Sequence, residues 1–198
     1  MNPSSVLRSL ATAAAPLTVV AFGLVLAAAA TAGAAVESSP FAVASSAVLL
    51  IALLGVGATA LLALGRLRDA DGAIASSVVA VVGTVLVAGG QWAALFVLPA
   101  LSVHAPTLLT SGALASVTIG YVASYAVFAL GWVATAVGLL RARLVPTGLG
   151  VFLLVGGIAS FVPAPEALRL LLVSIAATFV ARRISGREQA SEAVGQLV

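Results

Sequence analysis

The stretch 83–99, with the sequence GTVLVAGGQWAALFVLP, decides the fold of this chain. It lies inside a segment from about residue 73 to 101 that holds no charged residue. A helix needs about 20 mostly apolar residues to cross the roughly 30 Å of hydrocarbon in a bilayer. The stretch therefore predicts a membrane-spanning helix that carries one carboxamide, Gln91, at bilayer depth.

The composition of the whole chain supports the same class. Its 198 residues are 62% hydrophobic and only 8% charged, which is outside the range of soluble globular domains. All nine basic residues are arginines, and they occur in short connections between apolar runs. Nucleic-acid binding is not expected, because it needs a basic and solvent-exposed domain surface. The sequence predicts an integral membrane protein.

The cysteine and histidine counts exclude several kinds of site. The chain has no cysteine and a single histidine, His104. Disulfides, thiolate metal sites and haem held by two histidines of one chain are thereby excluded. We expect no cofactor.

The apolar runs predict an all-α fold with six membrane-spanning helices in one domain, residues 1–181. Residues 182–198 are predicted to form a polar cytoplasmic tail. The alternative for the first run is a cleaved signal peptide, but its apolar part is longer than a typical signal core. The predicted spans are 10–35, 41–65, 73–101, 113–140, 145–162 and 166–181.

The arginines predict the orientation of these spans. With six spans, Arg169 falls alone on one side and the other eight arginines on the opposite side. Arginine is enriched in cytoplasmic connections, so both termini are expected in the cytoplasm. The expected location of the protein is the plasma membrane.

Similar phrases recur along the spans and suggest three repeated helical hairpins. Gly83 with 89–90 resembles Gly150 with 156–157, and Ala-Thr pairs recur in the spans that return inward. The alternative is chance similarity in a chain built mainly of alanine, glycine, valine and leucine.

Polar and aromatic residues mark the faces of the third and fourth spans. Ser77, Thr84 and Gln91 are spaced by seven, which places them on one face of a helix. The fourth span carries an aromatic face at steps of three and four, made of Tyr121, Tyr125, Phe128 and Trp132, with Thr118. We predict that the two faces meet and that Gln91 contacts a tyrosine hydroxyl. This contact would line a ligand pocket; the alternative is ordinary packing between helices.

The predicted outer connections hold the other candidate site residues. Glu166 and Arg169 are three residues apart at the start of the last span and are predicted to pair on one helical face. Arg169 is expected to extend its side chain outward to water. His104 and Arg169 are the candidates for an extracellular ligand site.

The sequence lacks the residues that the common kinds of catalytic site need. No acidic or basic residue lies near the middle of a predicted span, so a proton relay has no groups to use. No serine–histidine pair, metal cluster or phosphate loop is present either. We predict that the protein is not an enzyme.

One short stretch resembles a known group of proteins. At Arg141-Ala-Arg143-Leu-Val-Pro146 the chain resembles uncharacterised bacterial six-helix membrane proteins of the domain-of-unknown-function type. Their fourth span ends in a similar turn before a glycine-rich fifth span like residues 148–157. The chain departs from them at Thr147, where a tryptophan often follows the proline. The resemblance covers 141–157 and implies six spans but no activity.

The sequence therefore favours a non-enzymatic membrane protein that binds a hydrophobic or lipid-like ligand, or a partner membrane protein or second copy of itself. The alternative is a substrate-binding or accessory subunit of a membrane transporter. The candidate ligand-binding residues are Gln91, Trp92, His104, Tyr121, Tyr125, Trp132 and Arg169.

Overall fold

The computed structural model describes residues 3–32, 39–67, 73–110 and 115–195, and all regular structure in these ranges is helical. The all-α class predicted from the sequence is confirmed. The helices are α1 (Pro3–Ala32), α2 (Pro40–Leu67), α3 (Ala73–His104), α4 (Pro106–Thr110), α5 (Ala115–Arg141), α6 (Thr147–Ala159) and α7 (Glu166–Gly195).

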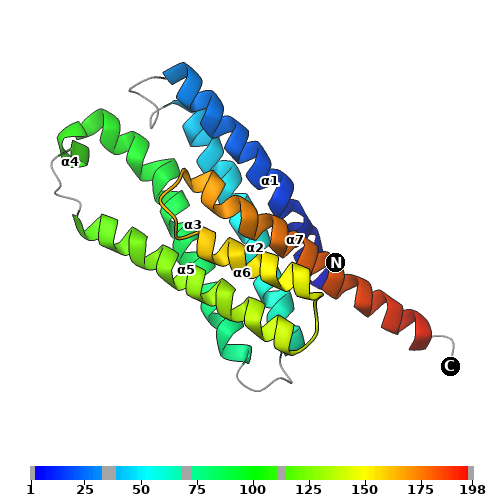
Figure 1. Ribbon diagram of the computed structural model, residues 1–198. Coiled ribbons are helices and arrows are strands. Elements are labelled where there is room, and N and C mark those ends of the chain that lie inside the picture. Colours follow the sequence, from blue (N-terminus) through cyan, green and yellow to red (C-terminus); the bar gives the residue numbers. More distant parts are fainter. Residues whose placement is uncertain (1–2, 33–38, 68–72, 111–114, 196–198) are drawn as a thin grey trace.

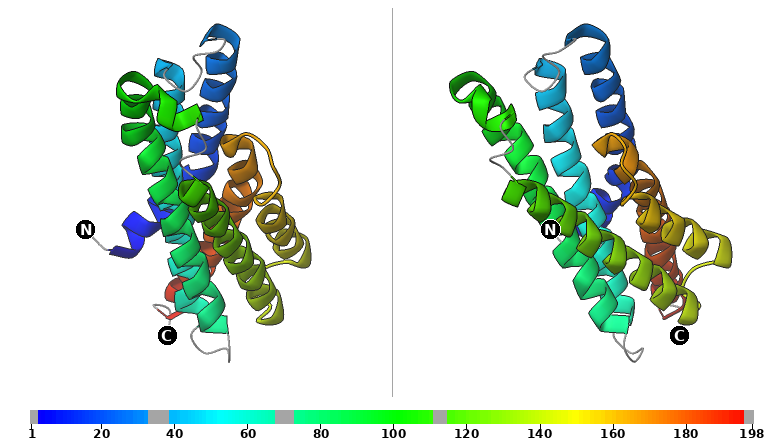
Figure 2. Two further views of the ribbon diagram at one scale, coloured as in Figure 1. Left: turned by 90° about the vertical axis from the view of Figure 1, so that its left-hand side faces the viewer. Right: turned by 60° about the vertical axis from the view of Figure 1, so that its left-hand side comes forward.

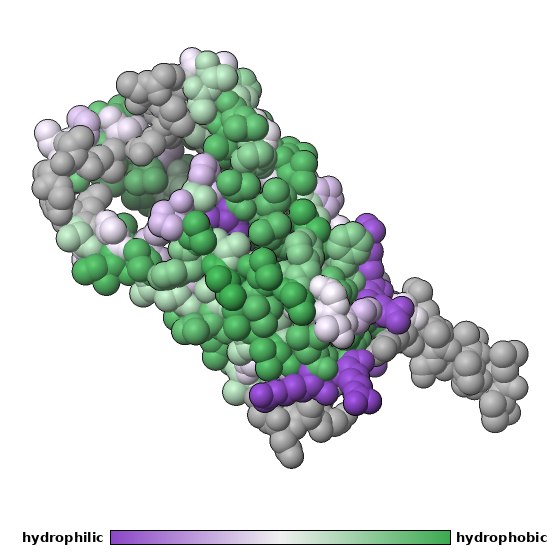
Figure 3. Space-filling model, viewed as in Figure 1, coloured by the Kyte–Doolittle hydropathy of each residue, from purple (hydrophilic) through white to green (hydrophobic). Residues whose placement is uncertain are grey.

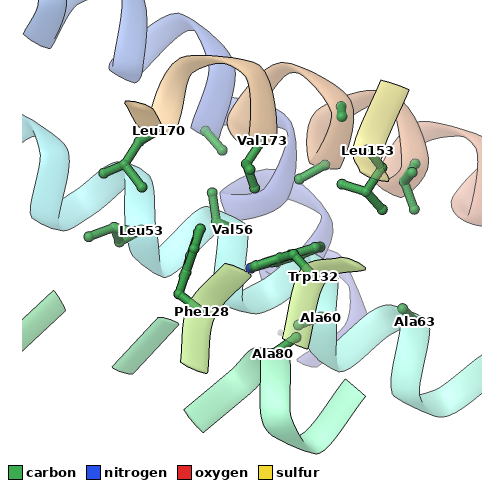
Figure 4. Close-up of a cluster of buried hydrophobic side chains, with 14 of the residues drawn as sticks. Leu53, Val56, Ala60, Ala63, Ala80, Phe128, Trp132, Leu153, Leu170 and Val173 are labelled. Carbon is green, nitrogen blue, oxygen red and sulfur yellow. The ribbon is translucent and has the colours of Figure 1, made fainter. Parts of the chain in front are cut away.

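Six of the helices form a closed ring. In the order α1, α2, α3, α5, α6 and α7 each helix contacts the next, α7 contacts α1, and α2 also contacts α7 across the ring (Figure 1). The largest buried side chains fill the middle. Figure 4 shows Val56 of α2 and Val173 of α7 on one side of Phe128 and Trp132 of α5, and Ala80 of α3 on the other. This core fixes the position of α5 against α7.

Hydroxyl groups close the ring between its first and last helices. Thr178 of α7 donates a hydrogen bond to the Ala11 carbonyl at 3.1 Å and accepts one from the Ala15 amide at 3.2 Å. In a regular helix the Ala15 amide would donate directly to the Ala11 carbonyl, and here the Thr178 hydroxyl lies between these two groups. Ala15 directly precedes Pro16, which lies inside α1. A hydroxyl inserted in this way is typical of a helix kink, and Figure 2 shows the first turns of α1 bending away from the bundle.

Within the described residues, four helices, α1, α2, α3 and α5, contain stretches long and apolar enough to cross a membrane. With 13 residues, α6 is about 20 Å long, short of the roughly 30 Å of hydrocarbon. The multi-pass membrane class is therefore supported by four helices, while the six predicted spans are not confirmed.

The C-terminal region continues the last helix. Residues 182–195 are predicted to form a polar tail, and in the structure α7 runs without interruption from Glu166 to Gly195. The helix already formed by the apolar half needs no new nucleation to continue into these residues. The polar turn at 68–72 and Glu37 lie outside the described residues.

Two glycines bring the backbones of α3 and α5 into close approach. A Cβ atom on Gly83 would lie 2.4 Å from the Cα of Phe128, and one on Gly131 would lie 2.5 Å from the Cα of Ala80. The backbones of the two helices touch at both places, which only small residues permit. The predicted meeting of these two helix faces is confirmed.

The glycines of the predicted repeat do not share one environment. Gly83 abuts the Phe128 backbone, whereas the Cβ position of Gly150 meets the side chain of Leu140. At Gly23 no described atom lies within 4 Å of that position. The three helical hairpins are present as neighbouring pairs, but their repetition is not confirmed.

The two ends of the bundle differ. We call one the arginine end, because Arg66, Arg141, Arg143 and Arg182 lie at or beside the helix ends there, and the other the α4 end. Hydrophilic side chains gather at the arginine end in Figure 3. At the α4 end, α1, α2 and α3 extend beyond the starts of α5 and α7 in both views of Figure 2. This step leaves a hollow beside the first turns of α7, with hydrophilic atoms at its floor in Figure 3.

Candidate functional site

Two tyrosines of α5 and the first residue of α7 form the centre of the site. The hydroxyls of Tyr121 and Tyr125 donate hydrogen bonds to the same oxygen of Glu166, Oε1, at 2.6 Å and 2.9 Å. Their ring centroids are 5.0 Å apart. The two phenols share one helical face, so a single acceptor from α7 satisfies both of them.

Arg169 completes this group, one turn after Glu166 on α7. Its Nη2 donates a hydrogen bond to the Tyr121 hydroxyl at 2.9 Å. Its guanidinium carbon lies 4.4 Å from the ring centroid of Tyr125 and 5.4 Å from that of Tyr121. The cation therefore rests on the aromatic faces, a favourable arrangement for arginine. We call Tyr121, Tyr125, Glu166 and Arg169 the tyrosine–arginine cluster.

The cluster corrects two expectations for α7. Glu166 and Arg169 were predicted to pair directly, but their charges meet on the Tyr121 hydroxyl, which donates to one and accepts from the other. Arg169 was expected to extend outward to water, yet it lies over the tyrosine rings because these supply both a cation–π surface and an acceptor.

The depth of the cluster also differs from that of a connecting loop. Tyr125 precedes Arg141 by 16 residues, and Glu166 precedes Arg182 by 16 residues. At 1.5 Å per residue, both groups lie about 24 Å along their helices from the arginine end, a distance shorter than the roughly 30 Å thickness of a bilayer core. Glu166 was not among the predicted site residues. Its spacing of three residues from Arg169 indicated a pair on one face of α7. The sequence did not indicate that Glu166 would accept hydrogen bonds from the tyrosines of α5.

Trp132 lies deeper in the bundle and serves the core. The rings of Tyr125, Phe128 and Trp132 follow one another with centroids 6.3 Å apart at each step. Trp132 is fully buried, and its Nε1 donates a hydrogen bond to Thr84 Oγ1 at 3.3 Å. The aromatic face of α5 is thus continuous, with the cluster at one end of it.

Gln91 is buried on α3 and does not join the cluster. Its side chain is 0% exposed, so its predicted position inside the bundle is confirmed. The predicted bond to a tyrosine is wrong, because both tyrosine hydroxyls donate to Glu166, and a carboxylate is a stronger acceptor than an amide. Neither Oε1 nor Nε2 of Gln91 has a hydrogen-bond partner among the described residues.

Two other predicted site residues lie elsewhere. Trp92 is 53% exposed on the outer surface of α3, where it stacks on Phe96 with centroids 5.5 Å apart. His104 is exposed at the C-terminal end of α3, 13 residues after Gln91, which is about 20 Å along the helix. The structure brings together Tyr121, Tyr125 and Arg169 from the predicted set.

A small groove between α3 and α5 adjoins the tyrosines. Its volume is about 200 Å³, and Tyr121 and Tyr125 form part of its wall. Gly90 has no side chain to fill the groove. A Cβ atom at this position would lie 3.8 Å from the Tyr121 ring. The remaining lining residues are Leu86, Val87, Val117, Gly120 and Ser124.

A second, wider groove of about 710 Å³ lies between α5 and α6 and is almost wholly apolar. It exists because α6 ends at Ala159 and the chain turns back through Pro163. No polar side chain lines it, so it offers no group that would select one ligand over another.

The cluster combines filled and unfilled hydrogen-bonding groups. Glu166 accepts two phenolic hydrogen bonds at one oxygen. Arg169 retains donors that the described residues do not fill, since its Nε is shielded from solvent without a partner. No protein-family model, curated protein or solved structure matches this chain.

Proposed function

We propose that the chain crosses the plasma membrane of a bacterial cell six times, with the arginine end in the cytoplasm. The arginines support this orientation, because among those in the described residues only Arg169 lies toward the α4 end. In this arrangement α6 and the first half of α7 are short crossings, accommodated by local thinning of the bilayer. Both termini then lie in the cytoplasm, and the tyrosine–arginine cluster lies at the depth of the outer leaflet.

The function that this geometry supports best is non-enzymatic binding of an amphipathic, lipid-like ligand at the cluster. The observation that carries the proposal is the tyrosine–arginine cluster itself, with two charged side chains held on two tyrosines inside an apolar bundle. Polar and ionisable groups at membrane depth are costly and usually mark a functional site. The groove between α3 and α5 gives the apolar part of such a ligand a place next to the polar part.

A transport role is the second candidate, and the hollow at the α4 end favours it. A hollow that opens toward the outside would let a substrate reach the cluster from water as well as from the bilayer (Figure 3). A subunit of a transporter would need a partner membrane protein, and co-purification of such a protein would favour this candidate.

The test is native mass spectrometry of the protein extracted with its native lipid, at low activation. We expect wild-type protein to retain one amphipathic molecule. Gly120→Phe, which fills the groove at a position with no described atom within 4 Å of the Cβ site, should reduce its occupancy at least tenfold. The matched control is Ile119→Phe, because Ile119 is 70% exposed on the same helix at the same depth.

Two results would contradict the proposal. One is a wild-type protein that carries no molecule beyond exchangeable bilayer lipid. The other is equal retention in Gly120→Phe and in Ile119→Phe, since a ligand in this groove must be displaced by the first change.

A further inference from the structure

We propose that Arg169 binds the anionic head group of the ligand, a carboxylate or a phosphate, while a single alkyl chain lies in the groove between α3 and α5. This inference rests on the proposed function and adds the chemical class of the ligand. Its evidence is the arrangement of donors, charges and ring faces around Arg169.

Arg169 is half-buried and has unfilled donors beside the tyrosine rings. A guanidinium carries five N–H groups, and in the described structure one nitrogen, Nη2, reaches an acceptor, the Tyr121 hydroxyl. Its Nε is shielded from solvent and has no partner among the described residues. Its Nη1 has no hydrogen-bond partner among the described residues and is not shielded from solvent, so a ligand oxygen can reach this nitrogen and gain a charge-assisted hydrogen bond. Carboxylate and phosphate oxygens match the planar fork of arginine best.

The charge of Glu166 does not occupy these donors. Its Oε1 is engaged by the hydroxyls of Tyr121 and Tyr125, and it meets Arg169 only through Tyr121. The guanidinium is therefore held in place by the carboxylate without being covered by it. An incoming anion replaces no existing ion pair, and the fold has already restricted the arginine side chain.

The ring faces argue against a cationic ligand. Tyrosine rings and a carboxylate are the groups that would recognise a quaternary ammonium. Here the face of Tyr125 is already covered by the guanidinium at 4.4 Å, and Glu166 already accepts two hydrogen bonds. A ligand cation would have to displace Arg169 and would also be repelled by it.

The groove limits the apolar part to one short chain. Its volume of about 200 Å³ is below the roughly 300–1,000 Å³ of pockets that enclose drug-sized ligands. Arg169 does not line the groove, but Tyr121 and Tyr125 belong both to the groove wall and to the cluster. A head group at the tyrosine end of the groove would therefore lie against the rings that Arg169 contacts.

The experiment measures binding of four probes that share one eight-carbon chain, to full-length protein in phosphatidylcholine nanodiscs. The probes are octanoate, octyl phosphate, octanol and octyltrimethylammonium, with acetate and inorganic phosphate as free anions. We expect the two anionic amphiphiles to bind at least tenfold more tightly than octanol. Arg169→Gln should weaken them about 10- to 100-fold and leave octanol unchanged.

The controls separate charge, geometry and folding. Arg141→Gln removes an exposed arginine at the opposite end of α5 and should leave all affinities unchanged. Arg169→Lys keeps the charge but loses the planar fork, so it should retain part of the preference for anions. If thermal unfolding shows that Arg169→Gln no longer folds, the ranking of probes by the wild type and by Arg169→Lys decides the question.

Each outcome has one meaning. If all four eight-carbon probes bind equally well, and Gly120→Phe abolishes their binding but Arg169→Gln does not, the head-group inference is wrong. The proposed function would still hold in that case. Tightest binding of octyltrimethylammonium also overturns the inference. If acetate binds as tightly as octanoate, and inorganic phosphate as tightly as octyl phosphate, the alkyl chain does not contribute to binding and this part of the inference is wrong. Binding that Gly120→Phe does not change contradicts the proposed function itself.

Discussion

Gly131→Ala is expected to destabilise the protein by about 3 kcal/mol or more, the upper part of the range for overpacked interiors. The new methyl group would lie 2.5 Å from both the Cα and the amide nitrogen of Ala80, where no side chain can rotate away. The helices α3 and α5 would have to separate, and α5 carries both tyrosines of the cluster. We expect the loss to exceed the gain of up to about 1 kcal/mol that alanine brings to a helix interior.

The matched control lies on the same helix. Gly120 has no described atom within 4 Å of its Cβ position, so Gly120→Ala should be neutral or slightly stabilising. The same contrast is expected within α3 between Gly83→Ala and Gly89→Ala. The measurement is reversible unfolding in mixed micelles. Equal stability of Gly131→Ala and Gly120→Ala would show that α3 and α5 do not touch through their backbones.

Gln91→Leu is expected to stabilise the protein by about 1–3 kcal/mol, although it removes the only carboxamide of the third span. Gln91 is fully buried and its two polar atoms have no partner among the described residues. Burying an amide without hydrogen bonds costs about this much, and leucine has a similar shape without that cost.

Thr84→Val is the control for Gln91→Leu, on the same face of α3. The Thr84 hydroxyl donates to the Ala80 carbonyl at 2.7 Å and accepts from Trp132 Nε1 at 3.3 Å. Removing it leaves a buried tryptophan N–H unpaired, which should cost about 1–3 kcal/mol. The two changes should thus have opposite signs in unfolding titrations. A loss of stability in Gln91→Leu would mean that a buried water satisfies the amide.

Helical periodicity predicted the contact between α3 and α5 correctly. The spacing of Ser77, Thr84 and Gln91 places all three in the interior, and the structure buries each of them. The aromatic face of α5 is buried at Tyr125, Phe128 and Trp132, while Thr118 at its outer end is exposed. Such patterns identify a face because a helix repeats every 3.6 residues.

The same geometry separates Trp92 from Gln91. Neighbouring residues on a helix are about 100° apart, so the two side chains cannot both face α5. Burying the carboxamide leaves the tryptophan outside, where it is 53% exposed. An aromatic ring at this depth suits the interface of a bilayer.

The partner of the tyrosines could not be predicted from the sequence. Glu166 lies 41 residues after Tyr125, on a helix that reaches α5 only because the ring closes through α6. The level of Glu166 in the bundle depends on the short length of α6. Because α6 is short, α7 begins below the ends of α1 and α3 (Figure 2). Periodicity describes the faces of single helices, but it does not state which helix ends meet.

The most direct test of the central claim, that the cluster lies on the outer side and is open to a ligand, is the accessibility of single cysteines along α5. The chain has no native cysteine, so Tyr121→Cys, Leu130→Cys and Arg141→Cys each carry one thiol. In intact cells, a membrane-impermeant thiol reagent should modify Cys at 121 only. The thiol at 141 should react after permeabilisation, and the one at 130, which is 67% exposed on the lipid-facing surface, under neither condition. Modification at 141 but not at 121 in intact cells would contradict the orientation and, with it, the outer-side ligand site.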